Sequence, residues 1–78
     1  MKLLVRNLSR TTTEQQIRLL FSEHGSVSQC NLVLDQETAK SKGFAFVEMP
    51  NDEEAKQALN SLHETRVDKN KIRVKIAK

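Results

Sequence analysis

The strongest hydrophobic pattern in the chain is a strict alternation over residues 42–49, which read Lys-Gly-Phe-Ala-Phe-Val-Glu-Met. Successive side chains of an extended strand point to opposite faces, so the pattern predicts a strand with two unlike surfaces. One surface holds only small or apolar side chains and is suited to a core: Gly43, Ala45, Val47 and Met49. The other surface combines aromatic rings with charges: Lys42, Phe44, Phe46 and Glu48.

The mixed surface of this strand is expected to face water, because burying an unpaired lysine or glutamate is costly. Phe44 and Phe46 are two of the three phenylalanines, and the chain has no tryptophan or tyrosine. Exposed rings beside cations suit a single-stranded nucleic acid, whose bases need flat apolar surfaces and whose phosphates need positive charge. The alternative is that a loop or a terminus buries one of the two rings.

Three further stretches alternate and predict strands, over residues 2–7, 27–34 and 71–76. Alternation turns one row of each strand inward, and these inward residues are all apolar: Leu3, Val5, Cys30, Leu32, Ile72, Val74 and Ile76. It turns the remaining positions outward: Lys2, Leu4, Arg6, Gln29, Asn31, Val33, Lys71, Arg73 and Lys75. The outer row of the last strand is therefore fully cationic.

A first helix is predicted to begin after Thr13, whose hydroxyl can form a capping box with Gln16. The stripe expected to be buried on this helix consists of Ile17, Leu20 and Phe21. Gly25 is placed to end the helix near His24 in a left-handed conformation. Residues 35–41 are polar and predict a mobile hairpin loop between two strands.

A second helix is predicted to begin after Asn51 as the cap, with Glu54 at its third position. Its apolar face is formed by Ala55, Ala58, Leu59 and Leu62. Residues 63–70 are polar and are expected to be a long connection. Within it, Asn70 is expected to take a left-handed conformation before the last strand.

The order strand, helix, strand, strand, helix, strand predicts an α+β fold, the ferredoxin-like βαββαβ sandwich. Two helices would pack on one face of a four-stranded antiparallel sheet and leave the other face open. Glu48 is the one carboxylate expected on that open face, against the cations Lys2, Arg6, Lys42, Lys71, Arg73 and Lys75. The helices carry more acidic than basic side chains, and this segregation of charge favours a polyanion on the sheet.

Residues 42–49 resemble the octapeptide signature of the RNA recognition motif, K/R-G-F/Y-G/A-F-V-x-F/Y, and depart from it only at Met49. That position points inward, where a flexible thioether can fill the space of a ring. Residues 3–8, Leu-Leu-Val-Arg-Asn-Leu, are similar to the second signature of the family, on its first strand. Leu4 stands where that signature usually carries a stacking aromatic. The resemblance covers the whole chain.

The resemblance implies a domain that binds single-stranded RNA on the open face of its sheet. On the family's pattern, Phe46 stacks on a base, Phe44 packs on a sugar or second base, and Lys42 reaches a phosphate. Leu4 offers apolar contact alone, so weak and sequence-tolerant binding is expected. The predicted RNA-binding residues are Lys2, Leu4, Arg6, Gln29, Asn31, Lys42, Phe44, Phe46, Lys71, Arg73 and Lys75, and the terminal Ala77 and Lys78 are expected to add hydrogen bonds.

The composition agrees with a small binding module. The length of 78 residues fits one domain, residues 1–78. A chain of this length resembles a stand-alone bacterial member of the family. The single cysteine, Cys30, has no disulfide partner and is expected in the core, as in a reducing cytosol. The chain shows neither a signal peptide nor an apolar run long enough for a bilayer, so we expect a cytoplasmic monomer and no membrane contact. The net charge of +3 gives a mild preference for anions.

The sequence offers little for catalysis. His24 and His63 lack a second ligand at metal-binding spacing, and two glycines form no phosphate loop. We expect no enzyme, metal or cofactor, although the same fold also hosts small enzymes. Two alternatives to RNA remain for the open face, namely single-stranded DNA and a protein that covers the sheet. Contacts to ribose hydroxyls would separate RNA from DNA.

Overall fold

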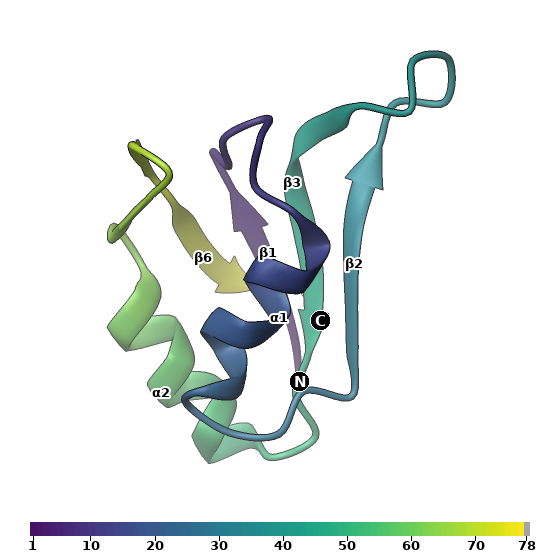
Figure 1. Ribbon diagram of the computed structural model, residues 1–78. Helices are drawn as coiled ribbons and strands as arrows, with labels where there is room; N and C mark the ends of the chain where they lie inside the picture. The colour runs from purple at the N-terminus through teal and green to yellow at the C-terminus, as the bar shows by residue number, and fades with distance from the viewer. Residues whose placement is uncertain (78) are drawn as a thin grey trace.

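The computed structural model describes residues 1–77, in which a four-stranded sheet carries two helices on one side (Figure 1). The elements follow in the order β1 (Lys2–Arg6), α1 (Glu14–Ser22), β2 (Gln29–Leu34), β3 (Ser41–Glu48), α2 (Asp52–Leu62), β4 (Arg66–Val67), β5 (Asn70–Lys71) and β6 (Arg73–Ile76). The main sheet has the order β2-β3-β1-β6, and every neighbouring pair is antiparallel. The predicted ferredoxin-like sandwich is confirmed.

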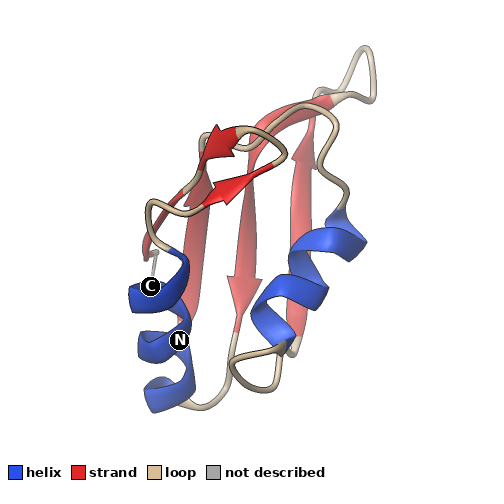
Figure 2. Cartoon of the chain, turned by 60° about the vertical axis from the view of Figure 1, so that its left-hand side comes forward, coloured by secondary structure: helices blue, strands red, loops and turns tan. Residues whose placement is uncertain are grey.

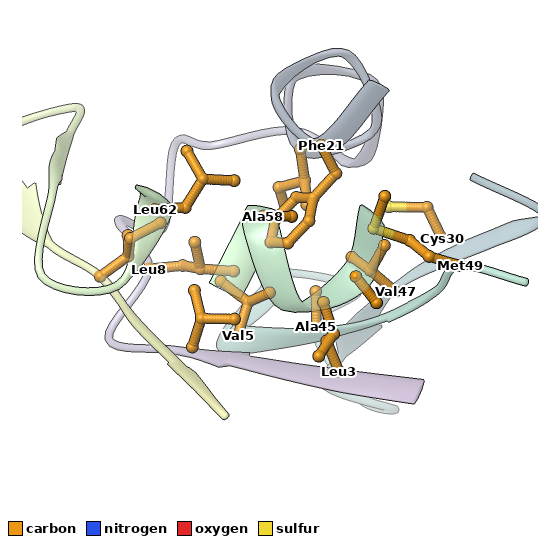
Figure 3. Packing of buried hydrophobic residues seen from close by; sticks show 14 residues of the cluster. Leu3, Val5, Leu8, Phe21, Cys30, Ala45, Val47, Met49, Ala58 and Leu62 are labelled. Atoms are coloured by element: carbon orange, nitrogen blue, oxygen red, sulfur yellow. The ribbon is translucent and has the colours of Figure 1, made fainter. Parts of the chain in front are cut away.

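The core lies between the helices and the inner face of the sheet (Figure 3). Alternation along the strands supplies its lower layer, since Leu3, Val5, Ala45 and Val47 are fully buried. From above, Phe21 of α1 points toward the sheet beside Ala58 of α2 and is also fully buried. Cys30 and Met49 also lie in the core as predicted, and each side chain is at most 3% exposed. The outward residues of the same strands are left for the opposite face.

Both helix starts are confirmed. The Thr13 hydroxyl accepts a hydrogen bond from the Gln16 amide at 3.2 Å, and the Gln16 side chain accepts one from the Thr13 amide at 2.8 Å. Asn51 Oδ1 accepts from the amides of Glu53 and Glu54 at 2.9 and 3.1 Å. Each cap satisfies amides that the first helical turn leaves without partners.

The predicted end of the first helix is wrong in its geometry. The α1 helix stops at Ser22, and Gly25 has a φ of 158°, close to extended backbone, so it is not the left-handed terminus. A glycine suits this position for another reason, because a Cβ there would overlap the Glu54 side chain. That carboxylate accepts a hydrogen bond from the Ser26 amide at 3.2 Å. The loop after α1 is thereby joined to the start of α2.

Residues 63–70, predicted as a plain connection, contain most of a second, two-stranded sheet formed by β4 and β5 (Figure 2). Its two-residue turn consists of Asp68 and Lys69, with φ of 50° and 71°. Positive φ at both positions is typical of a type I′ turn, whose twist matches a hairpin. The left-handed conformation expected at Asn70 is therefore wrong, and it occurs at the two preceding residues. Thr12 Oγ1 donates to Asp68 Oδ2 at 2.6 Å and fixes the hairpin to the loop after β1.

Two strand details also differ from the prediction. The pairing of β2 with β3 shifts between Leu32 and Leu34, so the end of β3 next to the loop bulges against β2. Ile76, predicted to point into the core, is 51% exposed, because it ends the short edge strand β6. No helix among residues 1–77 is long and apolar enough to cross a membrane.

Candidate nucleic-acid interface

A row of four side chains crosses the open face at the middle of the sheet. Antiparallel pairing places Phe46 opposite Leu4 on one side and opposite Asn31 on the other. Leu4 in turn pairs with Lys75 of the edge strand. Directly opposed residues have Cβ atoms about 4.5–5.5 Å apart on the same face. The row therefore presents an amide, an aromatic ring, an aliphatic side chain and a cation in succession.

Rows that contain charged residues flank this one on both sides. Toward one end of the sheet, Lys2 pairs with Glu48, which pairs with Gln29. Toward the other end, Arg6 pairs with Arg73 on β6. Like charges directly opposite each other destabilise a sheet. Arg6 and Arg73 thus place two positive charges side by side on the open face, and a bound polyanion would neutralise both.

The two rings of β3 form one apolar surface. Phe44 and Phe46 meet edge to face, with ring centroids 6.3 Å apart and planes at 87°. Both rings remain partly exposed, so no loop or terminal segment within residues 1–77 buries either one. Together with Leu4 and Arg6 they line a pocket of about 250 Å³. A ring face and an aliphatic floor of this kind accept the flat face of a base.

A lysine already occupies part of the Phe46 ring surface. Lys2 Nζ lies 5.2 Å from the ring centroid, within the range of a cation–π contact. At an exposed site such a contact is worth about 0.5–1 kcal/mol. A base that stacks on this side of Phe46 must therefore displace the ammonium.

Most of the predicted binding residues lie together on the open face or at its end. Those on the main sheet are Lys2, Leu4, Arg6, Gln29, Asn31, Lys42, Phe44, Phe46, Arg73 and Lys75. Lys71 is a correction, since it lies in β5 outside that sheet and its carbonyl accepts from Asn7 Nδ2 at 2.7 Å. Ala77 continues the edge pairing through its amide, which donates to the Lys2 carbonyl at 2.7 Å. The prediction for Lys78 lies outside the described residues.

Sequence reasoning missed Arg10, in the loop after β1. Its side chain lines a pocket of about 600 Å³ together with Arg6, Lys42 and Phe44 at one end of the open face. Arg10 belongs to no alternating or helical pattern, so its direction could not be read from the sequence. The one signal in the sequence was Gly43, because a glycine inside a strand often marks the close approach of another group. Arg10 Nε lies beside that glycine.

Two groups that could carry other chemistry, His63 and Cys30, have structural roles in the fold. His63 Nδ1 accepts a hydrogen bond from the Val74 amide at 3.0 Å, which joins the end of α2 to β6. Burial, and then the nearby Glu14 carboxylate, raises the pKa of the Cys30 thiol, so the reactive thiolate is disfavoured. Residues 1–77 contain no group of three histidine, cysteine or acidic side chains placed to hold a metal ion.

Comparison with other proteins agrees with this geometry. Residues 3–73 match the model of a family described as the RNA recognition motif. RbpB of Nostoc sp., which is named as an RNA-binding protein, is 42% identical over 62 residues, covering 80% of this chain and 60% of RbpB. The flowering time control protein FCA of Oryza sativa is 40% identical over 62 residues, covering 80% of this chain and 8% of FCA. The chain thus spans less than two thirds of either relative, and the single domain over residues 1–78 stays a prediction.

Solved structures share the whole fold. The crystal structure of RNA-binding protein PG1 superposes with a TM-score of 0.93 at 32% identity, covering 96% of this chain and 90% of that one. The structure of the Rna15 domain with bound RNA superposes with a TM-score of 0.88 at 25% identity, covering 97% of this chain and 81% of that one. The family model, the signature on β3 and the superpositions agree, and the chain belongs to the RNA recognition motif family.

Proposed function

We propose that the chain binds single-stranded RNA on the open face of its main sheet. One observation carries the proposal: Phe46, with Phe44 at its edge, lies at the centre of an exposed row that cations flank on both sides. Ring faces supply sequence-tolerant stacking, and the cations supply attraction to the phosphates. The Rna15 domain, which has RNA bound in its structure, supports this function through its fold.

The binding is weak in this proposal because the central row holds one ring where two would stack two bases. Leu4 takes the place opposite Phe46 and offers apolar contact without a flat face. Stacking is worth roughly 1–3 kcal/mol per base. Loss of one stacked base therefore lowers affinity by about one to two orders of magnitude. The site selects little by sequence, since every base has a face to stack.

The proposed function is tested by comparing an unstructured RNA oligonucleotide with a hairpin stem of the same length. Single-stranded RNA should bind more tightly, because duplex bases are already stacked on each other. Phe46→Ala should weaken single-strand binding by about 1–3 kcal/mol. Leu19→Ala is the matched control, because Leu19 is exposed on α1, away from the open face. Equal affinity for the two RNAs, or a Phe46→Ala variant that binds like the parent, would contradict the proposal.

Two other ligands of the same face are outcomes of this experiment. A deoxyribose oligonucleotide of the same sequence that binds equally well would assign the site to single strands of either sugar. If neither oligonucleotide binds, a protein that covers the sheet becomes the better assignment. The domain acts as a monomer in this proposal, with its sheet face free, and it needs no cofactor or catalytic group.

A further inference from the structure

The pocket beside Arg10 forms a cationic recess at one end of the open face. Its volume is about 600 Å³, and it lies between the loop after β1 and the start of β3. Three cationic side chains line it, namely Arg6, Arg10 and Lys42. None of the described residues that line it is acidic. The recess is thus suited to an anion and carries no internal counter-charge.

Hydrogen bonds hold the walls of the recess in place. Arg10 Nη1 donates to the Ser41 carbonyl at 3.1 Å, which fixes the guanidinium beside β3. The Leu8 amide donates to the Gly43 carbonyl at 2.8 Å and ties the loop to the same strand. A guanidinium group has five N–H donors, so one bond to a carbonyl leaves the others available. Arg10 is therefore oriented before any ligand arrives.

Gly43 makes the space that Arg10 occupies. Its φ of 88° lies in a region that residues with a Cβ rarely adopt. A Cβ at this position would come within 3.3 Å of the Leu8 carbonyl oxygen and 3.4 Å of Arg10 Nε. The bare backbone thus allows the loop to approach β3 and lets the guanidinium lie across the strand. The recess is a built feature of the bulged end of β3.

The recess is continuous with the aromatic surface. Arg6 and Phe44 line both the recess and the apolar pocket that contains Phe46 and Leu4. A strand whose bases stack on the two rings and continues past Phe44 therefore meets Arg6 and then Arg10. Guanidinium groups match the oxygen geometry of phosphate and pair with it through two parallel hydrogen bonds.

We propose that this recess binds a phosphate group of the strand that stacks on Phe44 and Phe46, with Arg10 as its principal donor. The inference rests on the RNA binding proposed above and adds a subsite beyond the stacking surface. The phosphate is either an internal phosphodiester or a phosphate at the end of the strand, since both carry the same acceptor oxygens. The recess in this way fixes how the strand is placed along the sheet.

The test compares the parent with Arg10→Gln and Arg18→Gln for one unstructured RNA oligonucleotide over a range of salt concentrations. Both variants lose one positive charge, but Arg18 is exposed on α1, away from the recess. Arg10→Gln should lower affinity by about threefold to tenfold. It should also reduce the slope of log affinity against log salt by up to about 0.7. Arg18→Gln should leave both quantities nearly unchanged.

Further probes identify the phosphate and guard against an unfolding effect. Thermal unfolding of each variant establishes that it is folded, and Arg10→Lys should keep the salt slope while recovering part of the affinity. The oligonucleotide is used with and without a terminal phosphate. An effect of Arg10→Gln that needs the terminal phosphate assigns the recess to a strand end, and an effect without it assigns an internal phosphodiester.

The two proposals fail in different ways. If a folded Arg10→Gln variant binds RNA as the parent does, while Phe46→Ala binds poorly, the recess has no role and the stacking face stands. If Arg10→Gln and Arg18→Gln lose affinity equally, the effect is one of net charge and the subsite is overturned. If the parent itself binds no RNA, the proposed function fails together with the inference.

Discussion

Leu4 and Phe46 lie directly opposite each other on the two central strands of the sheet, on its open face. One is aliphatic and the other aromatic, so the centre of the site has a flat surface on one strand alone. Leu4 is half-buried against its neighbours and already removes some apolar surface from water. We therefore expect this pair to limit the affinity of the open face for RNA.

Replacing Leu4 with an aromatic residue should tighten RNA binding. Leu4→Tyr adds a second ring beside Phe46, and its gain is limited to the roughly 1–3 kcal/mol of one stacked base. Because the position faces outward, stability should change by about 0.5 kcal/mol or less. The dissociation constants of variant and parent for one oligonucleotide at a single salt concentration check this.

Leu19→Tyr supplies the control for Leu4→Tyr, since Leu19 is 61% exposed on α1. It adds the same ring away from the sheet and should not alter RNA affinity. If a folded Leu4→Tyr protein binds no tighter than the parent, either the open face is not the RNA surface or position 4 is masked. A protein partner for that face would then be favoured.

Arg73→Gln should stabilise the free protein and weaken its binding to RNA. Arg73 lies opposite Arg6, and removal of one of two facing like charges should raise the free energy of unfolding by about 0.2–1 kcal/mol. The slope of log affinity against log salt should fall by up to about 0.7 if Arg73 contacts one phosphate. Urea unfolding and salt-dependent titrations measure the two effects. An unchanged salt slope would remove Arg73 from the interface.

Lys69→Gly should stabilise the hairpin of β4 and β5. Lys69 has a φ of 71°, and a residue with a Cβ in this region costs about 1–2 kcal/mol. Part of the gain is offset by the greater freedom of glycine in the unfolded chain. We expect a net increase of about 0.5–1 kcal/mol in the free energy of unfolding. Lys69→Ala removes the same charge but keeps a Cβ, so it should show no such gain in urea unfolding.

The loop between β2 and β3 should rearrange in acid. Asp35 Oδ1 accepts hydrogen bonds from the amides of Glu37 and Thr38 at 2.9 and 3.1 Å. These bonds, led by the one from Glu37, lower the pKa of the Asp35 carboxyl below its ordinary value of 3.8. Their stabilisation is thus present above about pH 4 and is lost as the pH falls through the lowered pKa. The amide resonances of Glu37 and Thr38 should report this titration.

Asp35→Asn is the matched variant for the acid experiment, because its amide oxygen can accept the same two bonds without titrating. The pH-dependent shifts of the Glu37 and Thr38 resonances should then be much smaller than in the parent. If they shift in the variant as in the parent, another group controls the loop.

The sequence predicted the long strands, both helix starts and the two faces of the sheet, because each rests on a repeated pattern or a local cap. The central row could be anticipated for the same reason, since alternation alone placed Leu4 and Phe46 outward. Features that do not follow a repeated pattern along the sequence were not predicted. The hairpin has two residues in each strand, too few to alternate, and Lys69 stands where such a turn usually has a glycine.

The remaining errors come from the tertiary arrangement of the elements. Gly25 is small because Glu54 packs against it, and Ile76 is exposed because the edge strand ends there. Arg10 reaches Ser41, 31 residues further along the chain, through a loop whose path depends on the bulge in β3. Patterns within a few residues carry no information on such pairs, so the cationic recess emerged only from the structure.

The Lys2 ammonium over the Phe46 ring also bears on whether two copies of the domain would associate through their open faces. An exposed apolar patch on a protein surface favours self-association. Two open faces brought together would enclose the cations Lys2, Arg6 and Lys75 of both copies, and these like charges would repel one another. That repulsion is strongest at low salt. We therefore expect this charge to oppose contact between the exposed rings of separate molecules, and self-association to appear only where salt screens it.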